Sequence, residues 1–179
     1  MVKQRILGTA DQRRVAVLSA AVSEFSAHGL AGASTANIAL RAQIAHSYVF
    51  KLFGSKVQLF LAATDHVYDR IADRFTAAVH GAPDAPLEAM GTAYQDMLGE
   101  REDLLVLLHG FAAAGDPAVG PTVRRRYTDL YSQVQAAADA SDERMRQFWA
   151  QGMLLTVAAA IELPLMTDQY PWVAGLLRR

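Results

Sequence analysis

The sequence predicts an all-α protein, and three observations support this fold class. Apolar residues recur at steps of three and four along most of the chain, as they do on the buried face of an amphipathic helix. Serine, glycine and proline fall where such helices would begin or end. No stretch of useful length alternates apolar and polar residues in the pattern of a half-buried strand.

The size and composition fit a globular fold of one domain or two small ones. The chain has 179 residues, of which 52% are hydrophobic and 20% charged, so it can bury a sizeable apolar core. It has no cysteine, and its amino terminus lacks the apolar stretch of a secretory signal. The sequence contains no run of about 18 uninterrupted apolar residues, so we expect no membrane span. We therefore expect a cytoplasmic protein with no membrane partner.

Residues 12–28 predict the first helix, whose apolar stripe would face the core. The stripe consists of Val15, Leu18, Val22 and Phe25. Gly29 is expected to end this helix. Ser34 and Thr35 offer a hydroxyl N-cap to a short second helix, which places Ile38 on its buried side.

A third short helix is expected from about Ala45 to Leu52, after a turn at Gln43 and Ile44. Its apolar side chains fall together on a helical wheel and would pack inward. They are Val49, Phe50 and Phe53. The opposite face is polar and aromatic, with Ser47, Tyr48 and Lys51, and His46 lies at the amino-terminal tip. This is the layout of a helix-turn-helix, whose second helix enters the DNA major groove.

The distribution of charge supports contact between this head and a polyanion. Residues 1–56 carry seven Lys or Arg against two acidic residues, a net +5, whereas the remainder carries ten basic and sixteen acidic residues, a net −6. A basic head on an acidic body suggests that only the head meets a polyanion, the alternative being random variation of the surface charge.

Helices are also expected through the rest of the chain. Gly54 breaks the third helix, and Ser55 can cap a long helix from Lys56 to about His80. The segment "HGAPDAP" (80–86) is the clearest linker. Further helices are predicted at about 87–99, 102–114, 117–139, 142–163 and 171–178.

The segment "VLSAAVSEFSAHGLAGASTANIALRAQIAHSYVFKLFGSKVQLF", residues 17–60, resembles the amino-terminal domain of the TetR (tetracycline-repressor) family of transcription regulators. The resemblance lies in the order and spacing of residues shared with the family. They are Ala20–Ala21, Phe25, Gly29, Thr35, Ile38–Ala39, Phe53, Ser55–Lys56 and Leu59. It implies an all-α homodimer with a three-helix, helix-turn-helix head (1–56) and a helical-bundle body (57–179) for ligand binding and dimerisation.

The resemblance also implies residue roles. His46, Ser47 and Tyr48 would read bases, while Thr35, Lys51 and Lys56 would contact phosphates, Lys56 with help from the positive end of its helix. The full set of expected DNA-binding residues is Thr35, Ala36, Arg41, His46, Ser47, Tyr48, Lys51 and Lys56.

Three positions depart from the family pattern and would weaken the grip on phosphate. Ala45 replaces a serine cap, Phe50 replaces a tyrosine and Leu52 replaces a histidine. Lys51, Arg41 and the basic residues of the amino-terminal arm could compensate. The arm carries Lys3, Arg5, Arg13 and Arg14.

In the body, aromatic residues and methionines recur at helical spacing, and most are expected in the core. A cavity between such residues would suit a small apolar or aromatic effector. The expected ligand-binding residues are Tyr94, His109, Phe111, Tyr127, Tyr131 and Trp149. His109 would supply a polar contact, although a core or edge histidine is the plainer interpretation.

The segment "QGMLLTVAAAIEL" (151–163) is apolar almost all round, so it must be covered on two sides. Together with the resemblance, this predicts a four-helix dimer interface, to which each subunit adds "WVAGLL" (172–177). A two-fold protein suits a two-fold operator.

Two charged clusters have plain structural interpretations. Asp65, Asp69 and Asp73 could form a metal-binding face, but neighbouring arginines favour a salt-bridged surface. The arginines of "VRRRY" (123–127) could form a second basic patch, a solvent face or an intersubunit partner for acids.

No catalytic motif appears: the sequence has no HExxH, G-x-S-x-G or phosphate loop. We therefore expect a transcriptional regulator that is not an enzyme and has no cofactor or metal. Its expected partners are double-stranded DNA, a small effector and a second copy of the chain. The alternative, a helical adaptor or scaffold, has no need of a +5 head.

Overall fold

The computed structural model describes residues 9–177, and its regular secondary structure is entirely helical over that range, which confirms the all-α class. In chain order the α-helices are α1 (Ala10–Gly32), α2 (Thr35–Arg41), α3 (His46–Phe53), α4 (Lys56–Gly81), α5 (Pro86–Asp96), α6 (Arg101–Ala112), α7 (Gly120–Ala138), α8 (Asp142–Ala160) and α9 (Trp172–Leu177). Short 3₁₀ turns occur at Met97–Gly99 and Leu163–Met166.

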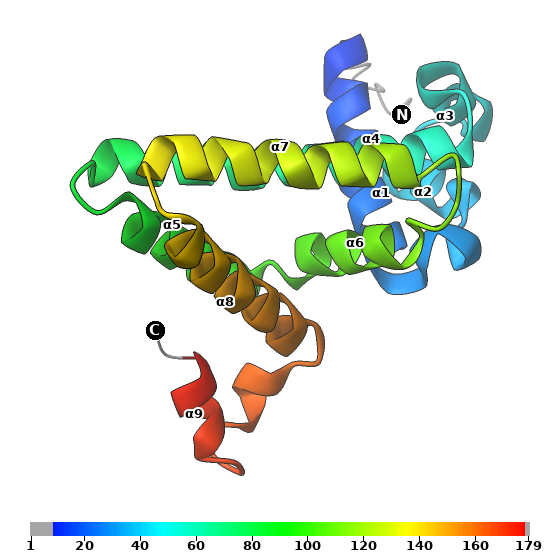
Figure 1. Cartoon of the computed structure of the whole chain (residues 1–179). Helices are drawn as coiled ribbons and strands as arrows, with labels where there is room; N and C mark the ends of the chain where they lie inside the picture. Colours follow the sequence, from blue (N-terminus) through cyan, green and yellow to red (C-terminus); the bar gives the residue numbers. More distant parts are fainter. Residues whose placement is uncertain (1–8, 178–179) are drawn as a thin grey trace.

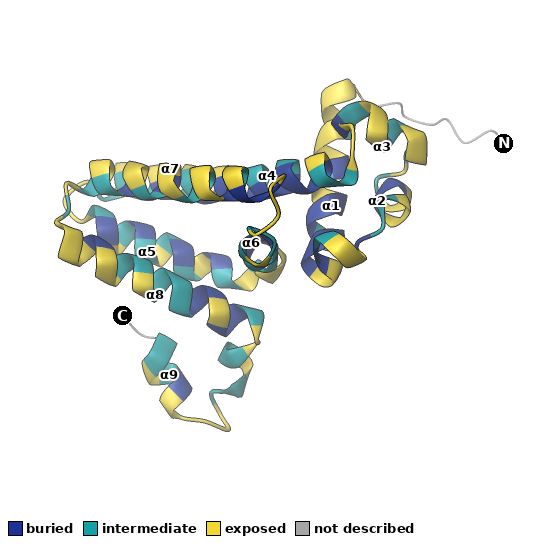
Figure 2. Ribbon diagram, turned by 45° about the vertical axis from the view of Figure 1, so that its right-hand side comes forward, coloured by how far each residue is buried: buried dark blue, intermediate teal, exposed yellow. Residues whose placement is uncertain are grey.

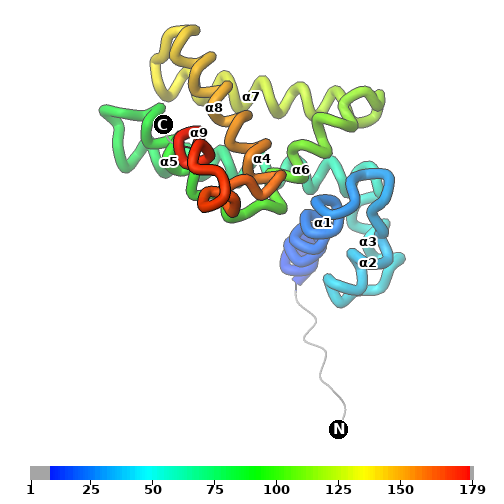
Figure 3. Tube along the Cα trace, turned by 90° about the horizontal axis from the view of Figure 1, so that it is seen from below, coloured from blue at the N-terminus to red at the C-terminus, as the bar shows by residue number. Residues whose placement is uncertain are grey.

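The helices form a head and a body joined by α4 (Figure 1). Helices α1, α2 and α3 surround the amino-terminal end of α4. In the body, α7 runs beside α4, α5 and α8 lie on one face of this pair, and α6 crosses towards the head (Figures 1 and 3). The carboxy-terminal α9 lies at the edge of the body. The three-helix head and the helical body were both expected.

The side-chain caps confirm most of the predicted helix starts. Ser34 accepts a hydrogen bond from the Asn37 amide at 3.3 Å, and Ser55 accepts one from the Gln58 amide at 3.1 Å. Gly54 adopts φ +81°, which ends α3 where predicted. Helix α1 begins at Ala10, two residues earlier than expected, because Thr9 and Gln12 form a capping box.

The prediction for the buried stripe of α1 was partly wrong. Val15 is 63% exposed, and the first buried residue of α1 is Val17, where other helices start to cover it. From there Phe25 is fully buried and meets Phe60 of α4 edge-to-face, with ring centroids 5.0 Å apart. By length and hydropathy α1 could cross a membrane, but here it packs against α2, α4 and α6 as a core helix.

The prediction for the core face of α3 was wrong for Phe50. Val49 and Phe53 are buried, whereas Phe50 is 39% exposed and its ring lies 5.2 Å from the ring of His46. At about 100° per residue, Phe50 lies a quarter turn from Val49, beyond the sector that the core covers. Its outward position adds an apolar ring to α3, much of whose ribbon is coloured as exposed in Figure 2.

A buried carboxylate, which the sequence analysis did not single out, fixes the start of α2. Glu24 of α1 is 2% exposed, and its carboxylate accepts hydrogen bonds from the Ser34 amide at 2.9 Å and the Asn37 side chain at 3.3 Å. A negative group near the amino terminus of a helix also interacts favourably with its dipole. Glu24 therefore positions α2 relative to α1.

A glycine bends α1 where it meets the body. Gly29 has φ +62° and ψ −176°, a conformation that only glycine adopts readily, so the regular helix is interrupted where the sequence predicted its end. A Cβ on Gly29 would lie 3.0 Å from Nδ1 of His109 in α6. The bend thus lets α1 and α6 approach closely.

We expect Gly29→Ala to lower the free energy of unfolding by about 1–3 kcal/mol, because it combines an unfavourable φ with a crowded contact. Gly81→Ala is the matched control, since a Cβ there meets nothing within 4 Å. Urea denaturation of both variants gives the comparison. Equal stability of the two variants would show that the bend at Gly29 carries no strain for alanine.

Candidate nucleic-acid interface and ligand cavity

The exposed side of α3 gathers most of the predicted base-reading residues. His46, Ser47 and Lys51 are exposed, and Tyr48 is half-buried. Ala45 precedes them without a side-chain cap, consistent with the loss of the serine hydroxyl noted in the sequence. Helix α2 packs against α3 and precedes it across a short turn, so the two form a helix-turn-helix.

A hydrogen bond joins two of the predicted DNA-binding residues across the two helices. The Thr35 hydroxyl lies 2.8 Å from Nε2 of His46. The bond fixes the orientation of the imidazole ring and leaves Nδ1 as its other polar atom. Ala36, next to Thr35, is exposed on the same turn of α2.

Two cations flank the ring of Tyr48. The guanidinium of Arg13 lies 5.4 Å from the ring centroid, and the ammonium of Lys51 lies 5.9 Å from it. Cations over an aromatic face are weakly attracted to it. The arrangement sets positive charge from α1 and α3 around one aromatic side chain.

The other residues predicted to contact DNA do not lie on α3. Lys56 Nζ donates to the carbonyl of Ala31 at 2.8 Å, so it is anchored to the carboxy-terminal end of α1. Arg41 donates to the Ser23 hydroxyl at 2.9 Å and is therefore directed at α1. Two predicted arm residues, Lys3 and Arg5, lie outside the described residues.

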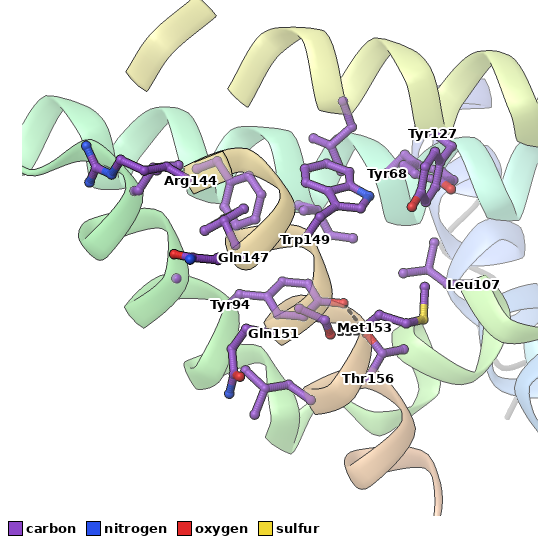
Figure 4. Close-up of a pocket in the computed structure, with 18 of the residues that line it drawn as sticks. Tyr68, Tyr94, Leu107, Tyr127, Arg144, Gln147, Trp149, Gln151, Met153 and Thr156 are labelled. Atoms are coloured by element: carbon purple, nitrogen blue, oxygen red, sulfur yellow. Dashed lines mark hydrogen bonds between the residues drawn. The ribbon is translucent and has the colours of Figure 1, made fainter. Parts of the chain in front are cut away.

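The body encloses a cavity of about 430 Å³ between α4, α5, α6, α7 and α8. This is within the range of ligand pockets. Rings dominate its middle: Trp149 lies 5.6 Å from Tyr127, and Tyr127 lies 5.9 Å from Phe111, both edge-to-face. Figure 4 shows Trp149 projecting between Tyr68 and Arg144.

Four of the six predicted ligand-binding residues line this cavity: Tyr94, Phe111, Tyr127 and Trp149. Tyr131 instead contacts Trp149 from outside, at 5.0 Å between ring centroids, and lines a neighbouring hollow. His109 is not in the wall, and its Nε2 lies 3.2 Å from the carbonyl of Ser26 in α1. The expectation that His109 contacts the ligand is thus not met, because its side chain faces the head.

The cavity also has polar groups, of which the sequence analysis missed Tyr68, Gln151 and Thr156. The Tyr94 hydroxyl lies 2.6 Å from the Thr156 hydroxyl, which itself donates to the carbonyl of Gly152 at 2.8 Å (Figure 4). The Tyr68 hydroxyl and the Gln151 amide nitrogen are buried, and no hydrogen-bond partner for either occurs within residues 9–177. No sequence pattern distinguishes these residues from ordinary core positions.

Burial keeps the two inner tyrosines neutral. It raises the pKa of the Tyr68 phenol well above its usual range, and the neighbouring phenols of Tyr127 and Tyr94 raise it further. Burial also raises the pKa of Tyr94, against the opposing effect of its hydrogen bond to Thr156. Both hydroxyls therefore retain their hydrogens at physiological pH.

Ion pairs between body helices engage Asp65, Asp69, Arg125 and Arg126 from the charged clusters noted in the sequence. Arg126 of α7 pairs with Asp65 at 3.3 Å and also with Asp69. Arg70 pairs with Asp103 at 2.6 Å and with Glu100. Among the described residues, no cluster of three or more His, Asp or Glu has the arrangement of a metal site.

Large apolar side chains lie exposed at the carboxy-terminal end of the body. On α8 and just after it, Val157 is 43% and Ile161 63% exposed. Leu165 and Trp172 are exposed at 81% and 59%. Val157, Ile161 and Trp172 fall in the segments predicted as a dimer interface, and Leu165 lies between those segments.

Comparison with known families assigns the head. Residues 17–63 match the sequence profile of the amino-terminal domain of bacterial regulatory proteins of the tetR family. The amino-terminal head is therefore that of a tetR-family regulatory protein. No sequence among the curated proteins matches it.

Solved structures of transcriptional regulators share the fold of this chain. A transcriptional regulator from Rhodococcus sp. Rha1 aligns with a TM-score of 0.70 at 18% identity, covering 94% of this chain and 92% of that one. A TetR family transcription regulator from Marinobacter aquaeolei VT8 aligns with a TM-score of 0.66 at 18% identity, covering 93% of this chain and 92% of that one. A TetR-like transcriptional regulator from Rhodococcus sp. RHA1 aligns with a TM-score of 0.60 at 24% identity, covering 93% of this chain and 86% of that one. At these identities the likeness concerns the fold alone.

Proposed function

We propose that this TetR-family regulator is a ligand-responsive repressor that binds a palindromic operator as a homodimer. The observation that carries the proposal is the path of α4. This helix begins at Lys56 in the head and lines the cavity with Tyr68, Ile71 and Phe75. A ligand that moves α4 therefore also moves the helix-turn-helix.

The exposed side of α3 supports the roles proposed for DNA contact. His46, Ser47 and Tyr48 lie near the amino-terminal end of α3, the end that reads base edges in helix-turn-helix proteins. Lys51, Lys56, Arg41 and Thr35 would hold phosphates, with Ala36 close to the backbone. Phe50 would offer the methyl group of thymine an apolar contact.

The exposed apolar residues support dimerisation through α8 and α9. Val157 of α8 and Ile161, the residue that caps this helix, lie one helical turn apart, so their side chains share a face. A second copy related by a two-fold axis would cover this face. Two recognition helices about 34–36 Å apart would then reach successive major grooves.

The cavity supports control by a small apolar or aromatic effector. A compound that binds better when α4 is tilted would favour the conformation in which the recognition helices no longer match the operator. By linkage, DNA would weaken the binding of the compound by the same factor. The protein would act without catalysis in the cytoplasm, with residues 1–56 as the DNA-binding unit and residues 57–179 as the regulatory unit.

Loss of one phosphate contact would appear in the salt dependence of DNA binding. We expect Lys51→Ala to reduce the slope of log K against log salt by about 0.9, because one fewer phosphate is neutralised. Arg146→Ala, at an arginine 72% exposed on the body, is the control and should leave the slope unchanged. Anisotropy titrations with an operator selected from random DNA give both slopes, and an unaltered slope for Lys51→Ala would remove it from the interface.

A charge on the exposed apolar face should split the dimer. We expect Ile161→Glu to weaken self-association at least tenfold, because the dimer would bury an unpaired carboxylate. Leu40→Glu places the same charge on a residue 78% exposed in the head and should not change the oligomeric state. Sedimentation velocity separates the two cases, and an intact Ile161→Glu dimer would place the interface elsewhere.

Filling the cavity should release DNA without dissociating the protein. We expect uncharged aromatic compounds that bind the body to displace the operator while sedimentation shows a dimer throughout. Trp149→Ala should blunt this response, Trp149→Phe should retain more of it, and both should bind DNA normally without the compound. Tight binding with no change in operator affinity would contradict the proposal.

A further inference from the structure

Tyr68 is a buried hydrogen-bond donor that the cavity wall leaves unused. Its side chain is 3% exposed, and no group within residues 9–177 hydrogen-bonds its hydroxyl. The ring is fixed from the α7 side, where the Arg126 guanidinium lies 5.6 Å from its centroid. A buried hydroxyl without a partner costs about 1–3 kcal/mol, so its presence in a cavity wall points to a ligand atom that pairs with it.

The other inner tyrosine differs in this respect. Tyr94 already shares a hydrogen bond with Thr156, and that threonine is also bonded to Gly152. Its polar requirement is therefore met within the protein. Of the two, only the Tyr68 hydroxyl lacks a hydrogen-bond partner within residues 9–177, and it lies near the phenol of Tyr127 (Figure 4).

The charges around the cavity disfavour a charged ligand. The ionic residues in its lining, Glu88 and Arg144, pair with each other at 2.9 Å and are both more than half exposed. Behind Tyr68, Arg126 is neutralised by Asp65 and Asp69. A charge placed among the rings would lose its hydration without gaining a counter-ion.

We propose that the effector is an uncharged, ring-containing carbonyl compound, such as an aromatic ketone, ester or lactone, whose carbonyl oxygen accepts a hydrogen bond from Tyr68. The carbonyl supplies the acceptor that the neutral phenol needs, and the rings pack against Trp149, Tyr127 and Phe111. This inference rests on the proposed ligand-responsive function and specifies the chemistry of its ligand.

Three matched probes test the inference on the full chain: 2-acetonaphthone, 2-ethylnaphthalene, which lacks the carbonyl, and the anion 2-naphthoate. Calorimetry or equilibrium dialysis gives the affinity of each for the wild type, Tyr68→Phe and Tyr94→Phe. The ratio of ketone to hydrocarbon affinity, compared between proteins, cancels the different solubilities of the probes. Thermal melts by circular dichroism confirm that each variant is folded.

We expect Tyr68→Phe to lower the ketone-to-hydrocarbon ratio by about three- to tenfold, the value of one hydrogen bond. Tyr94→Phe should leave the ratio within about twofold, because its hydroxyl is already engaged. The anion should bind more weakly than the ketone. A ratio unaffected by Tyr68→Phe, an anion that binds as tightly as the ketone, or no binding by any probe overturns the inference.

Operator affinity measured with the same probes separates this inference from the proposed function. If the ketone binds in a Tyr68-dependent way and leaves operator affinity unchanged, the carbonyl contact stands and the ligand-responsive function fails. If the ketone and the hydrocarbon release the operator equally from wild type and Tyr68→Phe, the function stands and the carbonyl contact fails.

Discussion

The structure depends on one uninterrupted helix that belongs to both the head and the body. Helix α4 contains no glycine or proline between Val57 and His80, so it has no residue that would favour a hinge. Its buried side is continuous, from Leu59 and Phe60 beside α1 to Ile71 and Phe75 at the cavity. A displacement at one end must therefore be transmitted as movement of the whole helix.

The second connection between head and body runs from α1 to α6 and limits how the head can move. The bend at Gly29 allows His109 to approach, and the imidazole contacts the carbonyl of Ser26. Nearby, Ser23 accepts a hydrogen bond from Arg41 of α2 and donates one to Glu102 of α6 at 3.0 Å. With α4, these contacts connect the helix-turn-helix to the body at two places, so a ligand-induced shift of α4 relative to α6 would change the inclination of the head.

Local features of the sequence predicted much of the fold, because helix starts and stops are encoded in a few adjacent residues. The caps at Ser34 and Ser55 and the breaks at Gly29 and Gly54 all appear where expected. Contacts between distant residues could not be obtained this way. Helical periodicity placed Phe50 in the core, since it does not show how wide a sector the neighbouring helices cover.

The same difference between local features and contacts of distant residues applies to the candidate site. Ring-rich helices predicted a cavity, and four of the expected side chains do line it, but the polar residues that give it chemical character were missed. Tyr68 lies among apolar residues of an amphipathic helix, where a tyrosine usually packs as a ring and sends its hydroxyl to water. Only the convergence of five helices around it shows that its hydroxyl is enclosed.

Pairing of charges within the body explains why the basic head can act alone on DNA. Arg70, Arg101, Arg125, Arg126, Arg144 and Arg146 of the body each form an ion pair with a body carboxylate. Lys51 of the head forms no ion pair with any described residue and is held only beside the ring of Tyr48. Because paired surface charges cancel beyond about one Debye length, roughly 8–10 Å in physiological salt, the long-range attraction to phosphates comes from the head. The field would thus orient the molecule with α3 towards the DNA, while the body stays away from it and remains open to its ligand.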